Sequence, residues 1–305
     1  MDFLLYWVAR LVVTVVQSLP LPLVARLGRL GGRLAHFLDA RHRNMARRNL
    51  TAAFPDLSQA EIKKLALENF QRIGENFACA VKTAAMSDEA LAPHLEFGPT
   101  GELPALLARE PRSVVFAIGH FGNFELYARA SRLLPGWQMA TTYRALRQPR
   151  LNQLMQSLRE RTGCLYFERR TDGEALRRKL LNDRLILGLL CDQHGGRRGL
   201  RLPFFGRDAS TNPAPAIFAL RYRLPLFTGF CFRTGPARWR LEVGELIPTF
   251  VNGKPRAVIE IMRDVNRAFE KAIRRDPANW FWVHNRWKTP GRPPVSSSSL
   301  ALEKR

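Results

Sequence analysis

Apolar residues dominate the beginning of the chain. Positions 3 to 16 are apolar except for Arg10 and Thr14, and Pro20 and Pro22 follow soon after. A helix needs about 20 mostly apolar residues to span a bilayer, and an arginine at its centre costs several kcal/mol. Because no small-residue cleavage site follows, a removed signal peptide fits poorly. Residues 1–27 are predicted to form a helical membrane anchor that spans marginally or lies in the interface; the alternative is a buried helix of a soluble protein.

A helical N-terminal region is predicted for residues 28–110. Residues 41–54 have the composition of an arginine-rich helix that stops before Pro55. Ser58, followed three residues later by Glu61, matches the capping box that begins many helices. Apolar residues then recur near the helical period as far as about Ala84, namely Ile62, Leu65, Phe70, Ile73 and Phe77.

The pattern changes near Pro111, where short apolar runs alternate with amphipathic segments. The runs predict strands at 113–118, 138–143, 164–167, 184–191, 225–232 and 238–246, the last of them an edge strand. Helices are predicted at 123–134, 151–161, 174–181, 214–221 and 258–274. Such alternation is typical of an α/β fold with a largely parallel central sheet flanked by helices. We therefore expect an α/β core at residues 111–290 and a flexible tail at 291–305.

The charge of the chain narrows the choice of partners. Lys and Arg total 48 against 26 Asp and Glu, which gives a formal net charge of +22. Such a charge attracts polyanions: a nucleic acid, an anionic bilayer or a phosphorylated substrate. Seven arginines directly follow the predicted anchor, as suits an anionic cytoplasmic leaflet: Arg26, Arg29, Arg33, Arg41, Arg43, Arg47 and Arg48.

The cysteines argue against a disulfide framework. The four residues are scattered without a CxxC pair, which predicts free thiols in a reducing compartment. Cys191 and His194 have a metal-like spacing, but no second pair completes a zinc site. No metal ion or bound cofactor is expected.

The segment that carries candidate chemistry is GHFGNFE at 119–125, directly after a predicted strand. Ligands of open α/β sheets bind beyond the carboxyl ends of the strands. A histidine there could remove the proton of an attacking hydroxyl, and a carboxylate on its other ring nitrogen would fix the tautomer. We predict His120 as the general base and Glu125 as the carboxylate that orients it. The alternative is a turn histidine and a charge at a helix N-terminus.

A second set of polar residues follows other strands and helices. Asn123 and the amides at the start of the helix after 119–122 are candidates for the oxyanion site. Arg144, Arg159 and Arg161 could bind phosphate or the oxyanion, although each could equally belong to a solvated basic face. Asp192 and Gln193 end an apolar strand, and Asp192 could orient an arginine or an acceptor sugar, or be a plain turn aspartate. His194 is assigned either a structural role or a place at the edge of the substrate, and His284 and Arg286 are assigned structural roles.

Several segments of the chain resemble the motifs of a known family. GHFGNFEL is similar to the first motif of the lipid A late acyltransferases (lauroyl and myristoyl acyltransferases), which share the His-x4-acid motif of glycerolipid acyltransferases. Four further blocks are similar to that family: TYRAL at 142–146 with LRER at 158–161, LCDQ at 190–193 before two glycines, LPFFG at 202–206, and WFWVHNRWK at 280–288. Ala145 stands where proline is usual, and Phe124 stands where tryptophan is common.

The resemblance implies an enzyme at the cytoplasmic face of the inner membrane. Its donor would be acyl carrier protein, with coenzyme A thioesters as an alternative, and its acceptor a hydroxyl of an acylated, phosphorylated glucosamine disaccharide. The absence of GxSxG and GxxxxGK[ST] motifs from the sequence favours direct attack of the hydroxyl on a thioester.

Two other functions stay open at this stage. The acceptor could be another glycolipid, an aminolipid or a lysophospholipid, because these relatives share the same motif. The charge of +22 also suggests a nucleic-acid-binding protein, but no aromatic-basic motif, zinc finger or recognition helix in the sequence supports this function. We therefore expect no nucleic-acid partner.

Overall fold

The computed structural model describes residues 2–288 of the 305-residue chain, so the predicted tail at 291–305 lies outside the described residues. Four helices come first: α1 (Asp2–Ser18), α2 (Leu21–Leu38), α3 (Ala40–Ala53) and α4 (Gln59–Thr83). The predicted capping box begins α4, since the Glu61 amide donates to the Ser58 hydroxyl while the Glu61 carboxylate accepts the Ser58 amide. The chain is therefore mainly helical from α1 as far as the end of α4.

The core contains a seven-stranded sheet in the order β1-β9-β8-β2-β5-β3-β4. Its strands are β1 (Leu95–Phe97), β2 (Val114–Ile118), β3 (Gln138–Tyr143), β4 (Leu165–Glu168), β5 (Leu185–Leu190), β8 (Leu226–Gly235) and β9 (Arg238–Ile247). All neighbours are parallel except β8 and β9. The predicted α/β class with a largely parallel sheet is confirmed.

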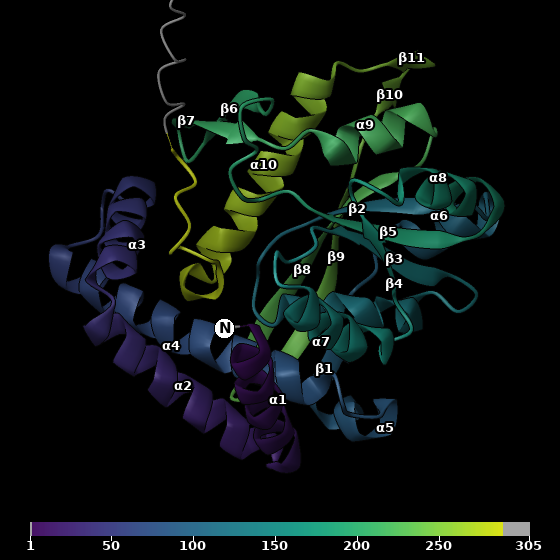
Figure 1. Ribbon diagram of the computed structural model, residues 1–305. Helices are drawn as coiled ribbons and strands as arrows, with labels where there is room; N and C mark the ends of the chain where they lie inside the picture. Colours follow the sequence, from purple (N-terminus) through teal and green to yellow (C-terminus); the bar gives the residue numbers. More distant parts are fainter. Residues whose placement is uncertain (1, 289–305) are drawn as a thin grey trace, which may run out of the picture.

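Helices flank this sheet (Figure 1). They are α5 (Asp88–Leu91), α6 (Leu103–Arg109), α7 (Pro149–Glu160), α8 (Gly173–Asn182), α9 (Ala214–Arg221) and α10 (Val258–Arg275), with short 3₁₀ helices η1 (Ala92–His94), η2 (Phe124–Leu133) and η3 (Pro277–Asn279). Two hairpins complete the chain: β6 (Leu200–Phe204) with β7 (Arg207–Thr211), and β10 (Phe250–Val251) with β11 (Lys254–Pro255).

Strand β2 is buried on both faces, as expected of a central parallel strand. Val115 and Ala117 pack in one hydrophobic cluster with α8, α9 and α10. Val114, Phe116 and Ile118 pack in a second cluster with α6 and η2 on the opposite face. The sheet is therefore covered on both sides.

The backbones of α2 and α4 are in direct contact where the two helices cross, because glycines line the crossing. A Cβ atom on Gly28 would lie 2.6 Å from the carbonyl oxygen of Gly74, and one on Gly32 would lie 2.1 Å from that of Phe70. Neither position has room for a side chain. The crossing fixes α2 against α4, which continues towards the carboxyl ends of the strands.

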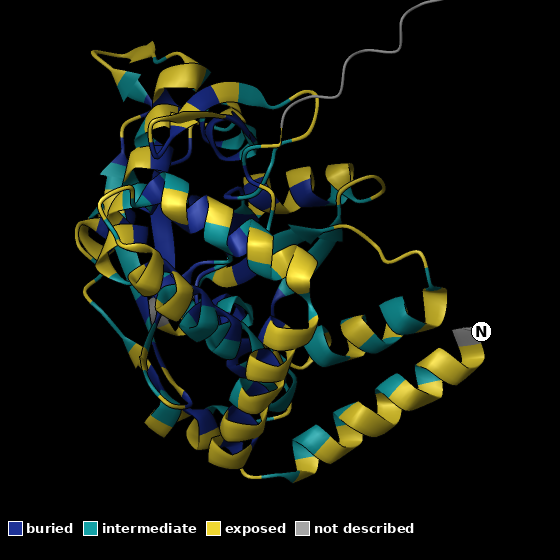
Figure 2. Cartoon of the chain, turned by 90° about the vertical axis from the view of Figure 1, so that its left-hand side faces the viewer, coloured by how far each residue is buried: buried dark blue, intermediate teal, exposed yellow. Residues whose placement is uncertain are grey.

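Helices α1 and α2 carry many exposed residues, drawn in yellow in Figure 2, and several of these residues are apolar. On α2 the buried residues face α4, while a second apolar row is exposed at helical spacing: Leu23, Leu27, Leu30 and Leu34. On α1, Phe3, Trp7 and Leu11 are all about half exposed or more. No helix within residues 2–288 is long and apolar enough to cross a bilayer.

Two predictions at this level are wrong, and the hairpin of β6 and β7 was not predicted. The strand β9 is not at the edge of the sheet, because β1, which lies inside the region predicted to be helical, pairs with its outer side. The segment after His120 forms a 3₁₀ helix, η2, and not an α-helix. The LPFFG block belongs to the unpredicted β6–β7 hairpin, whose turn residues Phe205 and Gly206 have φ values of 50° and 67°.

Candidate active site

His120 and Asp192 lie side by side at the carboxyl ends of two neighbouring parallel strands. The register of β2 and β5 places Ile118 opposite Leu190. Two residues further along each strand, the chain therefore reaches His120 on one side and Asp192 on the other. Residues 72 positions apart in sequence meet in this way.

The Asp192 carboxylate is fully engaged by three donors. Its Oδ1 atom accepts a hydrogen bond from Nδ1 of His120 at 2.8 Å, and its Oδ2 atom accepts the backbone N–H of His120 at 2.9 Å and the indole N–H of Trp280 at 2.8 Å. The residue is only 1% exposed. Burial raises the pKa of Asp192, but the bonds from His120 outweigh it, so the pKa lies below its ordinary value. The carboxylate is therefore ionised at neutral pH.

An ionised carboxylate at Nδ1 fixes the tautomer of the ring. Because Asp192 can only accept, Nδ1 of His120 carries the proton and Nε2 keeps its lone pair. The His120 side chain is 18% exposed and lines the main cavity. Phe124 packs edge-on against the ring, with a centroid separation of 4.7 Å. The ring is thus held in the orientation that a general base needs.

The prediction that Glu125 holds the ring is wrong. Glu125 instead accepts a hydrogen bond from Arg159 at 2.8 Å, on the wall of the same cavity. Burial lowers the pKa of Arg159, but Glu125 outweighs this effect and leaves that pKa above its ordinary value. The Arg159 guanidinium also lies over the ring of Tyr166. Glu125 and Arg159 are therefore an ion pair beside the histidine.

The backbone amides of the turn that carries His120 are used within the protein. The N–H of Phe121 donates to Gly119, and the N–H of Gly122 donates to Asn279. Gly122 has a φ of 51°, and a Cβ there would lie 2.6 Å from the Cys231 carbonyl oxygen. The turn thus needs glycine for its shape, and these amides do not face an oxyanion.

A cavity of about 900 Å³ opens in front of His120. Its inner part is mostly apolar and lies between η2 and the sheet, where Ile118, Tyr127, Ala128, Met139 and Cys164 line it. Its mouth is polar, with Arg144, Asn152, Arg169, Gln193 and Asn212 among the lining residues. Burial raises the pKa of Cys164 to about 12, so this thiol stays neutral. The cavity suits a molecule with an alkyl chain at one end and charged or polar groups at the other.

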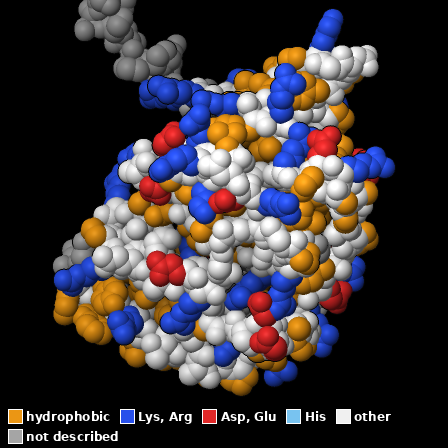
Figure 3. Space-filling view, turned by 90° about the vertical axis from the view of Figure 1, so that its right-hand side faces the viewer, with side chains coloured by type: hydrophobic (Ala, Val, Ile, Leu, Met, Phe, Trp, Pro, Cys, Tyr) orange, Lys and Arg blue, Asp and Glu red, His pale blue; other side chains and the backbone are white. Residues whose placement is uncertain are grey.

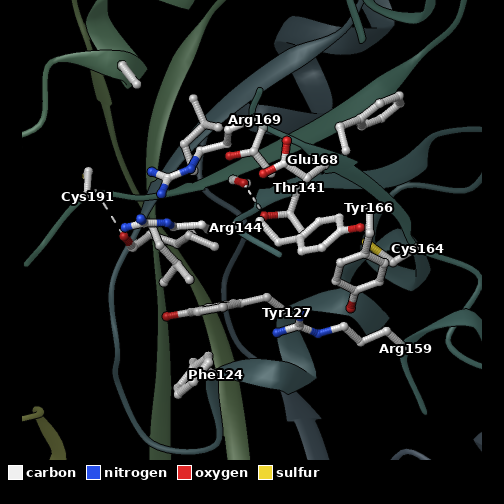
Figure 4. A pocket seen from close by; sticks show the side chains of 18 of the residues that line it. Phe124, Tyr127, Thr141, Arg144, Arg159, Cys164, Tyr166, Glu168, Arg169 and Cys191 are labelled. Carbon is white, nitrogen blue, oxygen red and sulfur yellow. Dashed lines mark hydrogen bonds between the residues drawn. The ribbon is translucent and has the colours of Figure 1, made fainter. Parts of the chain in front are cut away.

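Arginines reach this cavity from several elements, as Figure 4 shows for three of them. Arg144 and Arg169 follow β3 and β4, whose register pairs Tyr143 with Glu168, so the two arginines come from neighbouring positions. Arg169 was not predicted, although it comes only two residues after the strand predicted at 164–167. Arg161 is exposed and does not line this cavity, unlike the other two predicted arginines, Arg144 and Arg159.

The other candidate site residues lie either on the cavity wall or in the interior of the protein. Gln193 lines the cavity. Asn123 is buried, and its amide nitrogen lies 3.4 Å from the Thr83 hydroxyl, so it faces the interior of the protein. His284 accepts the backbone N–H of His194 through Nε2, and burial lowers its pKa to about 4. Arg286 is fully buried and donates to the hydroxyl of Thr211. The contacts of His284 and Arg286 agree with structural roles.

All four cysteines are buried free thiols, as predicted. A histidine whose tautomer is fixed by a carboxylate lies beside a cavity with an apolar interior and a basic mouth, and this arrangement suits acyl transfer.

A family model described as bacterial lipid A biosynthesis acyltransferase matches residues 2–289. The lipid A biosynthesis palmitoleoyltransferase of Escherichia coli (strain K12) is 28% identical over 297 residues, which cover 93% of this chain and 90% of that protein. The lipid A biosynthesis lauroyltransferase of the same strain is 24% identical over 292 residues, covering 93% and 92%. A lipid A biosynthesis acyltransferase of Haemophilus influenzae is 23% identical, covering 97% and 93%. The chain therefore belongs to the bacterial lipid A biosynthesis acyltransferase family and is an acyltransferase.

Proposed function

We propose that this enzyme transfers a fatty acyl chain from acyl carrier protein to a hydroxyl of a phosphorylated, glucosamine-based lipid, a precursor of lipid A. The observation that carries the proposal is the His120–Asp192 pair at the boundary between the apolar interior and the basic mouth of one cavity. The family and the printed names of the relatives, which specify lipid A biosynthesis and acyl transfer, support the same substrate class.

The chemistry follows from the tautomer of His120. Nε2 accepts the proton of the acceptor hydroxyl while the oxygen attacks the thioester carbonyl carbon. The C–S bond of the tetrahedral intermediate then breaks, and the imidazolium returns its proton to the departing thiolate. Asp192 stabilises the imidazolium between these steps, and no acyl-enzyme is formed.

Arginines are assigned to the negative charges of the reaction. Arg144 and Arg169 at the mouth would bind the phosphate of the acceptor through charge-assisted hydrogen bonds. Arg159 lies further in, beside Glu125 and Tyr166, and would stabilise the oxyanion. Gln193 would contact the sugar. These roles assign a separate group to each end of the substrate.

The donor and the location follow from charge and exposed apolar surface. Lys and Arg side chains are spread over the face shown in Figure 3, as would suit the acidic surface of an acyl carrier protein. The exposed apolar rows of α1 and α2, flanked by Arg26 and Arg33, fit helices that lie in the plane of an anionic bilayer surface. We infer attachment to the cytoplasmic face of the inner membrane.

The proposal is tested with purified protein, an acylated and phosphorylated glucosamine disaccharide, and either acyl carrier protein or coenzyme A thioesters. The wild-type enzyme is expected to add one acyl group, detected by mass spectrometry, and to prefer the carrier-protein donor. His120→Ala is expected to lower kcat by about 10²- to 10⁴-fold through loss of the base, whereas His42→Ala, at an exposed histidine, is expected to leave it unchanged. Near-normal turnover of His120→Ala would remove the assignment.

A further inference from the structure

A second, smaller cavity lies on the η2 face of the sheet. It has a volume of about 30 Å³, and four residues line both this cavity and the large one: Ile118, Tyr127, Met139 and Gly188. Beyond them its wall is formed by Leu103, Phe116 and Leu134 among others. The small cavity therefore adjoins the space in front of His120 across these four residues, and we call it the extension.

The walls of this extension select an alkyl chain. Glu242 is the one lining residue with a carboxylate, and it is paired with Arg275 at 2.8 Å. The Tyr127 hydroxyl donates to the carbonyl oxygen of Gly229 at 3.2 Å, so its polar end is satisfied within the protein. A polar ligand group would find no free partner among the described lining residues and would lose its hydration. Methylene groups have no such cost.

Gly188 keeps this space open from the middle of the sheet. It lies in β5, between β2 and β3, where a glycine weakens a strand because it packs no side chain. Its backbone does not require glycine, since its φ lies outside the left-handed region. An added Cβ would approach the Cδ1 atom of Ile118 at 3.0 Å and otherwise meet nothing closer than 3.8 Å. The missing side chain thus leaves volume that a ligand can fill.

We propose that the end of the donor's acyl chain lies over Gly188, and that Gly188 and Met139 set the longest chain the enzyme accepts. The inference rests on the proposed function. Ile118 directly precedes the turn that carries His120, so a chain whose carbonyl reacts at His120 passes Ile118 and Tyr127 to reach the extension. The extension is small, so it holds only the terminal carbons.

The test uses one variant that narrows the extension and one that widens it. Gly188→Val adds methyl groups to its floor, and Gly188→Ala serves if valine disturbs the fold, since alanine requires Ile118 to move by only a few tenths of an ångström. Met139→Ala removes a buried wall residue. Gly31→Ala is the matched control, because an added Cβ there meets nothing within 4 Å.

Each enzyme is given an equimolar mixture of acyl carrier protein thioesters with acyl chains of about 10 to 18 carbons, and products are identified by mass. Burial of one methylene is worth about a fourfold change in affinity. Gly188→Val is expected to shift the preferred chain by about two carbons towards shorter donors and to lower the long-to-short product ratio roughly tenfold. Met139→Ala is expected to shift the preference towards longer donors, and Gly31→Ala to leave it unchanged.

A thermal-shift series with free fatty acids of the same lengths separates the two proposals. A length limit in fatty-acid binding that moves in the Gly188 variants, without any transfer by the wild type, would refute the proposed function and retain the extension as a chain site. Transfer by the wild type with an unmoved length profile in both Gly188 variants would overturn the inference. A changed preference among acceptors of different acylation, with constant donor preference, would also overturn it.

Discussion

Replacing Asp192 with asparagine tests the central pair of the site with a change of only one functional group. The carboxylate accepts three hydrogen bonds, one from the ring of His120 at Oδ1 and two at Oδ2, from the His120 amide and Trp280. Asparagine offers one oxygen and one amino group in their place. The orientation of the new amide decides the outcome.

The hydrogen-bond energies favour one orientation of the asparagine. An amino group at the Oδ2 position would leave two buried N–H donors without an acceptor, at a cost of about 1 to 3 kcal/mol each. In the opposite orientation the oxygen serves both donors and the amino group faces Nδ1 of His120. The ring then has to accept at Nδ1, so its proton moves to Nε2 and the base is lost. The substitution therefore changes the tautomer more than the fold.

The expected loss of kcat is about 10³- to 10⁴-fold, or about 4 to 5.5 kcal/mol of transition-state stabilisation, as for the corresponding change in a serine protease triad. Steady-state transfer gives kcat and KM, and urea denaturation gives the free energy of unfolding, which should fall by only about 1 to 2 kcal/mol. Asp183→Asn, at an aspartate paired with Lys179 on the surface, is the matched control. A kcat within tenfold of the wild type for Asp192→Asn would refute the reasoning.

Three further measurements follow from other contacts. In a double-mutant cycle on kcat/KM, Glu125→Gln and Arg159→Gln should show a coupling energy of about 1 to 3 kcal/mol. The reason is that each single substitution leaves the other partner unpaired on the cavity wall. Additive effects of the two substitutions would contradict the ion pair. For His284, the folded pKa of about 4 lies below the ordinary 6.5, so the unfolded chain binds the proton first and stability is lost as the pH falls from about 6.5 through about 4. Between pH 6.5 and 4, the free energy of unfolding of His284→Gln should fall by about 2 to 3 kcal/mol less than that of the wild type, measured by urea denaturation at each pH. Parallel pH profiles of the two proteins would contradict this expectation. Gly32→Ala should destabilise the protein by about 2 to 3 kcal/mol, since its Cβ would overlap the Phe70 carbonyl oxygen, and an unchanged urea midpoint would argue against the close crossing.

Local patterns predicted most of the fold. Runs of apolar or β-branched residues gave β2, β3 and β5 to within about a residue at either end. For β2 and β5 the reason is that strands buried on both faces need continuous apolar sequence. The capping box gave the start of α4. By contrast, β1 has three residues and lies among helices, too short for an alternating pattern to emerge. Its pairing partner β9 was consequently misplaced at the edge.

The partner of the histidine could not be found in this way. Asp192 was recognised at the end of a strand, but Glu125 was preferred because it is close in sequence. The identity of the carboxylate beside His120 depends on β2 and β5 being neighbours in the sheet, although β3 and β4 lie between them in sequence. The packing of helices on both faces of the sheet determines which parallel strands pair, so the strand order cannot be predicted from any single segment of the sequence. The same limit hid the convergence of Arg144 with Arg169.

The last described stretch of the chain is tied to the first helices by two buried amides. Asn49 donates to the carbonyl oxygens of Trp282 and His284, and Asn69 donates to those of Ala278 and Trp280. Since Trp280 in turn donates to Asp192, the hydrogen bonds of the carboxylate that contacts His120 depend on a segment that follows every strand of the seven-stranded sheet in sequence. A nascent chain that stops short of this segment holds every strand of the seven-stranded sheet and yet lacks one of the three donors to Asp192, so we expect activity to begin only after residues 278–284 have emerged and packed.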